Sequence, residues 1–474
     1  MARTSYAPYA AALAAVALLA TGGCGSTELP PGTARHVVVI SIDTARADHF
    51  GFMGSETVRT PGLDRFAGES VVFTDYMTVV PTTLASHTSL FTGKYPMHHG
   101  TARNGFVVNE RNSMLAEVLK EAGFRTAGFA GSFSLDSRFG FAQGFDHYDQ
   151  EFDIYVGDEG ADQNQRRAEH VTDAVLAYLD GEGVPDRLFL FAHYFDPHSP
   201  YAPPPPYDRM YDPRGADGIM SAMAIKRRSN LTAEEAQQAV SRLEMAYASE
   251  ISYTDEHVTR LLDELRQRGV LDDALIVITT DHGECLWEHG EEFDHGRTVY
   301  QATMHGLCVM RLPGGEQGGA RVDDLVASID VMPTVLALAG LEPPDGIDGE
   351  AIPLRSADGS VGSRTRFGEA TKPRSAAETD PRWTNIRKSR CMREGTHKFI
   401  STPYEGTEEM YDVLADPHER ADLLTGSGTE PEPAPDLRAR LTRWTDSAMP
   451  LPSHFDSTQT EESIERLRSL GYLN

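Results

Sequence analysis

Three segments that lie far apart in the sequence share one pattern, an unbroken apolar run that ends on acidic or imidazole side chains. They are HVVVISID (36–43), LFLFAHYFDPH (188–198) and LIVITTDHGE (275–284). Apolar runs without polar alternation are typical of strands that are buried on both faces, as in a parallel sheet covered by helices. This pattern restricts the chain to folds of the α/β class.

Helical patterns separate these expected strands. Apolar residues recur at three- and four-residue spacing in SMLAEVLKEAGF (113–124), in EHVTDAVLAYLDGEG (169–183) and in a long segment that ends at Gly269 (234–269). Alternating strands and helices predict a doubly wound sheet, in which ligands bind beyond the carboxyl ends of the strands. We therefore expect one site to collect the polar residues that follow the three strands: Asp43, Asp196, His198, Asp281 and His282.

The chain divides into five expected parts. Residues 35–312 form the main α/β domain, and the turn-rich LPGGEQGG (312–319) leads into a smaller α+β subdomain over residues 313–425, with short strands and hairpin turns. The other parts are a signal peptide (1–24), a tether (25–34), and a linker with a terminal helix (426–474).

The amino-terminal residues have the pattern of an export signal. The apolar run AALAAVALLA (11–20) is too short to span a bilayer as a permanent helix, and small residues precede Cys24, where a bacterial lipoprotein is lipidated. We expect an exported protein that is anchored to a membrane only through a lipid on Cys24 and faces the periplasm or the exterior. The alternative is secretion after cleavage.

The charge of the chain excludes one class of partner. With 71 acidic and 43 basic residues the formal net charge is −28, whereas nucleic-acid-binding proteins gain most of their affinity from lysine and arginine on phosphates. We therefore expect no nucleic-acid partner. The cysteines after Cys24 are Cys285, Cys308 and Cys391, and because three cannot all pair, no disulfide framework is predicted.

Two features indicate chemistry on an anionic ester. Asp43, Asp281 and His282 offer two carboxylates and an imidazole at strand ends, a set that suits one divalent cation. The segment VPTTLASHTSLFTGKYPMHHG (80–100) is rich in hydroxyls and could begin a helix, whose first N–H groups favour an anion. A hydroxyl at that helix start, next to a metal, would be an activated nucleophile, although capping hydroxyls in a polar turn would explain the same residues.

In combination, these motifs resemble the sulfatase family of the alkaline phosphatase superfamily. The similarity runs from about His36 to Leu423 and rests on VVVISIDTARADHFG, TPGLDRFA, SHTSLFTGKYP, GFRTAGF, HYFDPHSPY, TTDHGECLWEHG, FDHGRTVY and EEMYDVLADPHERADL. The resemblance implies an alkaline-phosphatase-like α/β/α sandwich with a smaller C-terminal α+β subdomain. It also implies a metal-dependent ester hydrolase with a small-molecule or glycan ester as substrate.

The resemblance implies roles for individual residues. By matching position, Asp43, Asp281, His282 and Thr83 would hold the metal, and Thr83 would be the nucleophile. The metal would be one divalent ion (calcium, manganese or zinc), with two ions as the alternative.

Further residues of the site follow from the same resemblance. His198 and His295 would contact the leaving group or the ester oxyanion. His87 is expected among the catalytic residues, and Ser86 is expected to bind substrate together with the two histidines.

The sequence departs from the sulfatases at the nucleophile. In sulfatases a cysteine or serine that becomes formylglycine is followed by proline two positions later and arginine four positions later, whereas this chain has Thr83, Ala85 and His87. Threonine already carries a methyl group on the carbon that would become the aldehyde. In addition, Thr44 replaces the second acid of an Asp-Asp pair, and AGSF (130–133) replaces a Gly-Lys-Trp-His segment that grips sulfate.

Thr83, Ser86 and His87 instead resemble the nucleophile segment of nucleotide pyrophosphatases and phosphodiesterases, in which threonine precedes Asn-His at the same spacing. A threonine sulfate ester lacks the exit that a formylglycine hydrate provides, while a phosphothreonine can be resolved by attack at phosphorus. An Asp-x-x-x-His pair for a second metal is missing from HYFDPHSPY, so the site is expected to hold one ion.

Three functions are consistent with the sequence. The first is a sulfatase-family hydrolase of sulfuric or phosphoric esters that acts through a threonine nucleophile. The second is a phosphodiesterase or phosphotransferase on envelope or extracellular phosphoesters, and the third is a non-catalytic lipoprotein that binds anionic glycans. The third has least support, because a binding protein needs no nucleophile beside a metal.

Overall fold

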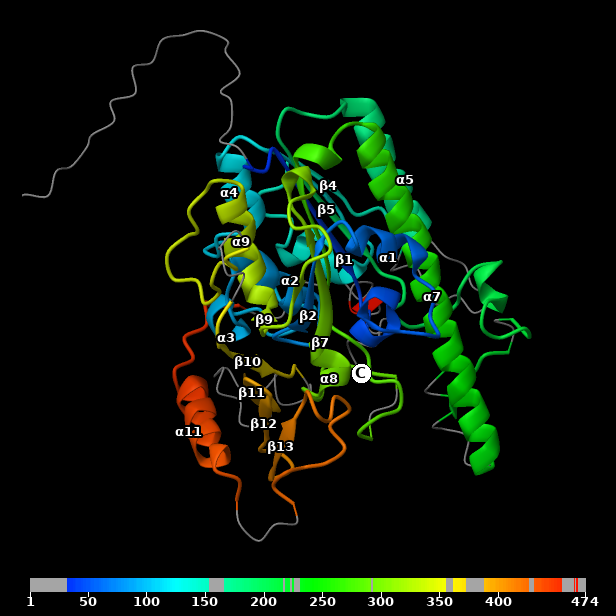
Figure 1. The fold of residues 1–474 in the computed structure, drawn as a ribbon, viewed down its shortest axis with the longest axis vertical. Helices are drawn as coiled ribbons and strands as arrows, with labels where there is room; N and C mark the ends of the chain where they lie inside the picture. The colour runs from blue at the N-terminus through cyan, green and yellow to red at the C-terminus, as the bar shows by residue number, and fades with distance from the viewer. Residues whose placement is uncertain are drawn as a thin grey trace, which may run out of the picture. The chain divides into compact units, whose positions relative to one another are not determined.

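A nine-stranded sheet forms the centre of the protein (Figure 1). Its strands are β1 (His36–Ile42), β2 (Val71–Met77), β3 (Arg125–Phe129), β4 (His147–Asp149), β5 (Leu188–Tyr194), β6 (Ala274–Thr280), β7 (His305–Arg311), β8 (Arg321–Val322) and β9 (Val326–Ala327). Their order is β4-β3-β5-β1-β6-β7-β2-β8, and β9 pairs with β2. Only β7 runs antiparallel to its neighbours.

The computed structural model describes residues 32–152, 166–215, 218–221, 224–225, 231–290, 293–354, 361–371, 388–425, 430–453, 464, 466 and 467. The expected signal peptide, most of the tether and Cys24 lie outside these residues.

The three segments expected to be parallel strands are β1, β5 and β6. β1 pairs in parallel with both of the others, and Val37 lies opposite Phe189 on one side and Leu275 on the other. Every residue of the three strands is buried. The prediction of a parallel α/β sheet buried on both faces is therefore confirmed.

Alternate side chains of β1 enter different cores because successive residues of a strand point to opposite faces. Val38 and Ile40 join a cluster with the helices α1 (Pro61–Ala67), α5 (Ala168–Glu182) and α7 (Ala233–Gln267). Val37 and Val39 join a cluster with α2 (Thr83–Thr92), α4 (Leu115–Glu121) and α9 (Val331–Leu338). Figure 1 shows α5 and α7 on one side of the sheet and α4 and α9 on the other, which is an α/β/α sandwich.

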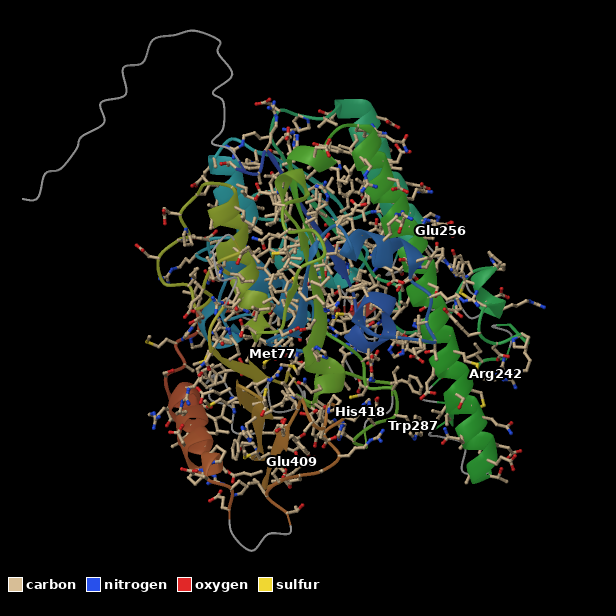
Figure 2. All side chains as sticks on the ribbon, viewed as in Figure 1. Met77, Arg242, Glu256, Trp287, Glu409 and His418 are labelled. Carbon is tan, nitrogen blue, oxygen red and sulfur yellow. The ribbon has the colours of Figure 1, made fainter. Side chains whose placement is uncertain are left out.

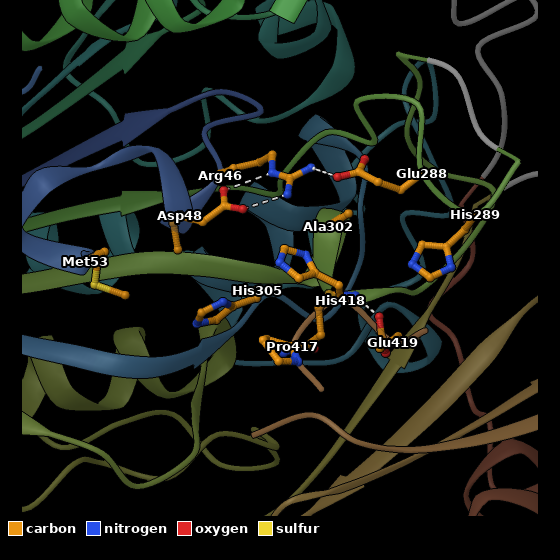
Figure 3. Close-up of a pocket in the computed structure, with 12 residues that line it drawn as sticks. Arg46, Asp48, Met53, Glu288, His289, Ala302, His305, Pro417, His418 and Glu419 are labelled. Carbon is orange, nitrogen blue, oxygen red and sulfur yellow. Dashed lines mark hydrogen bonds and ion pairs between the residues drawn. The ribbon is translucent and has the colours of Figure 1, made fainter. Parts of the chain in front are cut away.

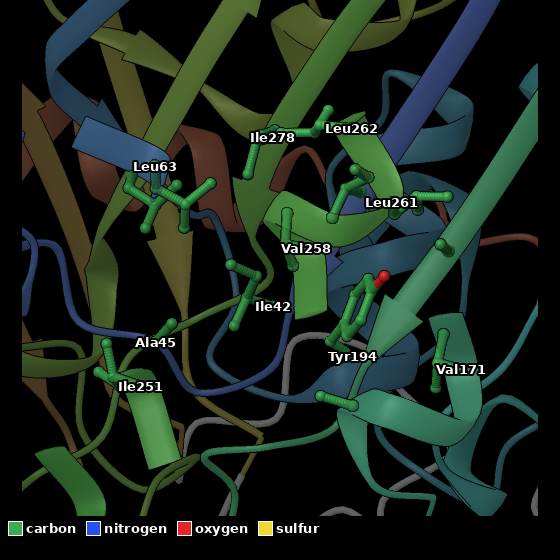
Figure 4. Close-up of a cluster of buried hydrophobic side chains, with 14 of the residues drawn as sticks. Ile42, Ala45, Leu63, Val171, Tyr194, Ile251, Val258, Leu261, Leu262 and Ile278 are labelled. Carbon is green, nitrogen blue, oxygen red and sulfur yellow. The ribbon is translucent and has the colours of Figure 1, made fainter. Parts of the chain in front are cut away.

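The long helix α7 covers most of one face. Its Thr232 cap accepts from the backbone N–H of Glu235, and Gly269, with φ of 72°, follows its last turn as the sequence predicts. Val258 and its apolar neighbours pack against Ile42 and Ile278 (Figure 4). Polar side chains of the same helix, among them Glu256 and Arg242, point away from the sheet (Figure 2).

A second, antiparallel sheet follows in the chain. It contains β10 (Thr365–Glu369), β11 (Arg390–Glu394), β12 (His397–Thr402) and β13 (Thr407–Asp412) in that order. The helix α11 (Pro433–Asp446) packs Leu437 and Leu441 against Met392, Phe399 and Met410 of this sheet. This arrangement confirms the smaller C-terminal α+β subdomain.

The boundaries differ from the expected ones in two places. The strands β8 and β9 pair with β2, and α9 packs in the main core, so the large domain continues beyond residue 312, where the sequence analysis ended it. Residues 433–446 form the helix α11, inside the part of the chain (426–474) for which a linker with a terminal helix is expected. Near the end of the chain, Leu467 is fully buried in the main core.

The structure also contains two short helices, α3 (Pro96–His99) and α8 (Gln301–Met304). None of the helices in the described residues is long and apolar enough to cross a membrane. Cys285, Cys308 and Cys391 are buried free thiols.

Candidate active site

The carboxyl ends of β1 and β6 and the start of α2 meet at one edge of the large sheet. Asp43 directly follows β1, and Asp281 and His282 directly follow β6; Asp43 and His282 are fully buried, and Asp281 is 4% exposed. Thr83 is the first residue of α2, and its hydroxyl donates to Asp43 Oδ2 at 3.3 Å. The structure thus brings together the four residues that the resemblance implies for metal and nucleophile.

Three buried acceptor atoms converge here without a hydrogen-bond donor among the described residues: Asp43 Oδ1, Asp281 Oδ2 and His282 Nε2. His282 Nδ1 donates to the carbonyl of Gly283 at 2.9 Å, so its Nε2 carries the lone pair. This Nε2 lies 3.8 Å from Asp43 Oδ1 and 3.5 Å from Asp281 Oδ2. Tetrahedral ligands at roughly 2.1 Å from one ion are roughly 3.4 Å apart, so the three atoms could hold one cation.

The pKa shifts of these groups also indicate a site for a cation. Burial raises the pKa of Asp43, and burial together with the nearby charge of Asp43 raises the pKa of Asp281. Burial lowers the pKa of His282 and keeps the imidazole neutral. Two charged carboxylates in this desolvated place are unfavourable on their own, and a bound cation removes that cost.

Two further imidazoles, His198 and His295, lie next to this group, as expected. Their ring centroids are 5.2 Å apart, and the ring of His295 is 4.4 Å from that of His282. His198 follows β5 and donates from Nδ1 to the carbonyl of Ser199 at 2.7 Å.

The loop that follows β6 supplies a carboxylate to His295. His295 Nδ1 is 3.2 Å from Glu284 Oε1, and Tyr201 donates its hydroxyl to Glu284 Oε2 at 3.2 Å. Glu284 is 1% exposed, and an isolated contact between Cys285 and Asp294 folds the loop back on itself. Glu284 is not among the residues expected at the site, because its partner His295 is eleven residues away on the returning half of the loop.

His87 and Ser86 lie in the site but use their polar atoms on the protein. His87 donates from Nδ1 to the carbonyl of Thr83 at 2.7 Å, and its Nε2 accepts from Ser41 Oγ at 2.9 Å. Ser86 donates to the carbonyl of Asp281 at 2.6 Å. These bonds brace the backbone that presents Thr83 and Asp281, and contact of either side chain with a substrate stays a prediction.

The structure adds His193 to the site. His193 is on β5, fully buried, and its Nε2 is 3.2 Å from Asp43 Oδ2. The only sequence signal is that His193 interrupts the apolar run of its strand. Asp196, which was expected at the same edge of the sheet as His198, accepts from the backbone N–H of Ala168 at the start of α5.

Thr44 has a strained backbone beside Asp43. Its φ is 53°, a left-handed conformation that is unfavourable for a β-branched residue. The Thr44 N–H donates to Asp281 Oδ1, and its carbonyl accepts from the Tyr247 hydroxyl at 2.8 Å. Such strain is concentrated at functional sites, where neighbouring contacts impose it.

A cavity of about 180 Å³ lies beside the loop that follows β1, and neither Asp43 nor Thr83 lines it (Figure 3). Its charged lining is paired internally: Arg46 contacts Asp48 and Glu288, each at 2.7 Å, and Glu419 contacts Lys398 at 2.8 Å. Arg46 thereby joins the loop after β1 to the loop after β6, and the Lys398–Glu419 pair lies within the C-terminal subdomain.

Comparison with known proteins gives matches to one family. Residues 35–341 match the family model Sulfatase, and residues 287–446 match the model of the N-sulphoglucosamine sulphohydrolase C-terminal region. An ulvan-active sulfatase of Formosa agariphila is 26% identical over 83% of this chain and 77% of that protein. The multifunctional alkaline phosphatase superfamily protein PehA of Trinickia caryophylli is 26% identical over 68% of this chain and 76% of that protein.

Solved structures share the fold. A phosphonate monoester hydrolase from Silicibacter pomeroyi superposes with a TM-score of 0.68 at 23% identity and covers 90% of this chain and 98% of its own. A protein determined in complex with its substrate D-glucosamine-2-N,6-O-disulfate superposes with a TM-score of 0.69 at 20% identity, over 88% and 97% of the two chains.

Proposed function

Because this chain belongs to the sulfatase family and is an ester hydrolase, we propose that it is an exported, metal-dependent hydrolase of phosphoric diesters or phosphonate monoesters that acts through Thr83. The observation that carries the proposal is the hydrogen bond from the Thr83 hydroxyl, at the first position of α2, to a carboxylate of the candidate metal site.

Asp43 Oδ1, Asp281 Oδ2 and His282 Nε2 would hold the metal, because these three buried lone pairs have no other use among the described residues. A divalent cation bound there supplies positive charge for the anionic oxygens of the ester. A set of two carboxylates and one imidazole suits manganese or zinc better than calcium, which prefers six to eight oxygen ligands.

The first chemical step transfers the phosphoryl or phosphonyl group to the protein. Thr83 Oγ1 forms a bond to phosphorus while the bond from phosphorus to the leaving oxygen breaks. The hydroxyl proton moves along its hydrogen bond to Asp43 Oδ2, and the leaving oxygen receives a proton from His295. In the second step water attacks phosphorus and gives a proton to His295, and Thr83 Oγ1 leaves and recovers its own proton.

His295 suits the general acid role better than His198. The Glu284 carboxylate faces His295 Nδ1 and stabilises the ring when both of its nitrogens carry protons, while its Nε2 serves the substrate. The Nδ1 partner of His198 is a neutral backbone carbonyl, which gives less stabilisation to a charged ring. We assign His198 to hydrogen bonding with the ester.

The chemistry of threonine favours phosphorus over sulfur. A phosphothreonine is hydrolysed by attack at phosphorus, whereas a formylglycine hydrate expels sulfate from its own carbon, and Thr83 cannot form that hydrate. Sulfate esters are the second candidate, because the C-terminal region matches a sulphohydrolase model and the ulvan-active relative is named a sulfatase.

Four p-nitrophenyl esters separate the candidates. The protein loaded with Mn²⁺, Zn²⁺ or Ca²⁺ is assayed with p-nitrophenyl sulfate, p-nitrophenyl phosphate, methyl p-nitrophenyl phosphate and p-nitrophenyl phenylphosphonate. We expect the highest kcat/KM on one of the last two. Turnover of the sulfate alone would make the protein a sulfatase with an unusual nucleophile, and no turnover with metal bound would favour the glycan-binding lipoprotein.

Variants of Thr83 test the nucleophile. Thr83→Ala and the nearly isosteric Thr83→Val should each lose at least about a thousandfold in kcat, and Thr83→Ser should stay within about tenfold of the wild type. The neighbouring Thr82, whose hydroxyl donates to the carbonyl of Pro81, gives the matched control Thr82→Val. Full activity of Thr83→Val would remove Thr83 from the mechanism.

Export and anchoring are supported by the amino-terminal pattern that ends at Cys24. In a bacterial host, the full chain should fractionate with membranes and incorporate an alkyne-labelled fatty acid, and Cys24→Ser should lose both properties. Label-free protein in the soluble export fraction would instead indicate secretion after cleavage.

A further inference from the structure

The buried edge of the site contains unpartnered donors in addition to its three unpartnered acceptors. Among the described residues, neither the Thr44 hydroxyl nor His193 Nε2 has a hydrogen-bond partner, and His193 Nε2 is the donor considered next. A buried N–H without an acceptor leaves the loss of its hydrogen bonds to water uncompensated. The three converging lone pairs require a cation, whereas the N–H at His193 Nε2 requires an acceptor atom. A cation that is bound together with an anion satisfies both.

His193 lies next to the proposed nucleophile. Its Nε2 is 3.2 Å from Asp43 Oδ2, and the hydroxyl of Thr83 is 3.3 Å from the same oxygen. Although the first distance is short, the contact lacks the alignment of a hydrogen bond, so it leaves the His193 donor unsatisfied.

The protonated nitrogen of His193 follows from one backbone contact. The N–H of Gly131 points at His193 Nδ1 over 3.3 Å, and because a backbone N–H can only donate, Nδ1 must accept. A neutral imidazole that accepts at Nδ1 carries its proton on Nε2. Gly131 cannot easily withdraw from this contact, because its backbone is packed so tightly on β5 that a Cβ there would lie 2.4 Å from the carbonyl oxygen of His193.

The positions of the imidazole protons also exclude a second metal site. His87, His193 and Asp281 lie close enough together to hold an ion. However, His87 donates from Nδ1 to a carbonyl and accepts at Nε2 from Ser41, while His193 has its proton on Nε2. Neither imidazole presents a lone pair to a cation, so this trio is not a ligand set.

We propose that His193 Nε2–H donates a hydrogen bond to a non-bridging oxygen of the group that is transferred to Thr83, and that it does not bind the metal. The proposal rests on the proposed function for the identity of that group. Each nitrogen of His193 then has one role: Nδ1 accepts from the Gly131 N–H, and Nε2–H donates to the anion.

Variants at His193 distinguish a donor from a ligand and from a packing residue. Phenylalanine keeps the ring and removes the donor, and glutamine places an amide N–H near the position of Nε2. His36 is the matched control, because its Nδ1 also accepts a backbone N–H, from Leu188 at 3.2 Å, at the amino end of β1. If His193→Phe does not fold, His193→Asn, which has no atom at the Nε2 position, replaces it.

Binding of orthovanadate to the Mn²⁺-loaded protein, followed by calorimetry, tests the donor without requiring turnover. His193→Phe should bind vanadate about tenfold or more weakly, His193→Gln should recover most of the affinity, and His36→Phe should match the wild type. On methyl p-nitrophenyl phosphate, His193→Phe should lose about 100-fold in kcat. Unchanged vanadate affinity of His193→Phe would overturn the proposal.

Metal binding separates the roles further. Mn²⁺ affinity should stay within about threefold of wild type in His193→Phe, and pulsed EPR of the Cu²⁺-loaded wild type should count one coordinated imidazole, that of His282. Two coordinated imidazoles, or loss of Mn²⁺ binding in His193→Phe, would make His193 a ligand. A wild type that binds vanadate through His193 but hydrolyses none of the four esters would refute the proposed function alone.

Discussion

Replacing Asp43 by asparagine should stabilise the metal-free protein at neutral pH. Burial raises the pKa of Asp43 from 3.8 to about 8, so folding at pH 7 forces a carboxyl that is charged in the unfolded chain to take up a proton. About three pH units separate 3.8 from 7, and at about 1.36 kcal/mol per unit the cost is about 4 kcal/mol. Asparagine has a similar shape and avoids that cost.

The effect should depend on pH in one direction. A carboxyl whose pKa is raised on folding contributes its full stability below pH 3.8 and loses it as the pH rises through about 8. The advantage of Asp43→Asn over the wild type should therefore be near zero at pH 4 and grow to about 4 kcal/mol at pH 7.

Urea unfolding in EDTA, followed by tryptophan fluorescence at several pH values between 4 and 8, measures this difference. Asp330→Asn is the control, because Asp330 is fully buried but is paired with Arg366, and its neutralisation should destabilise the protein by about 3–5 kcal/mol. An Asp43→Asn protein that is less stable than the wild type, or whose advantage does not change with pH, would refute the reasoning.

Three other predictions follow from the same contacts. Binding of Mn²⁺ at pH 7 should release protons, and its affinity should fall as the pH falls below about 8, because the raised pKa of Asp43 leaves a proton on the ligand; calorimetry in buffers of different ionisation enthalpy would contradict this if the heat were independent of buffer. Arg393→Met should lower the free energy of unfolding in urea by about 3–5 kcal/mol, because Arg393 makes two hydrogen bonds to Asp75 between the two sheets and the variant leaves that carboxylate unpaired. Adding Asp75→Leu should recover most of that loss. Additive losses in the double variant would show that the ion pair is not the cause. Glu284→Gln should reduce turnover of alkyl esters at least about tenfold more than turnover of p-nitrophenyl esters, whose leaving group needs no acid; equal losses would contradict the role given to His295.

The parts of the fold that the sequence predicts are those with long, regular patterns. β1, β5 and β6 are continuous apolar runs because both of their faces are buried, and α7 shows a clear helical period between a capping threonine and a glycine. The convergence of Asp43, Asp281 and His282 follows from the topology, since parallel neighbours end at the same edge of a sheet.

The parts that the sequence does not predict depend on pairing between distant segments. β8 and β9 have two residues each and exist only because β2 offers them an edge. Glu284 becomes a partner of His295 only when the loop after β6 turns back.

His193 shows the same limit inside the site. In the sequence it is one polar residue in a buried strand, and such histidines are usually core residues. Its role as a donor depends on the approach of Gly131, which follows β3, and on the position of Asp43. Neither contact has a local sequence signal.

The most direct test of the account is whether Thr83 becomes covalently modified during turnover. The Mn²⁺-loaded protein is mixed with methyl p-nitrophenyl phosphate, quenched in acid within milliseconds and analysed by peptide mass spectrometry. We predict a methylphosphoryl group on Thr83 in the wild type, none in Thr83→Val, and retention of configuration at a chiral phosphorus. Turnover with no modified Thr83 and with inversion at phosphorus would contradict the account.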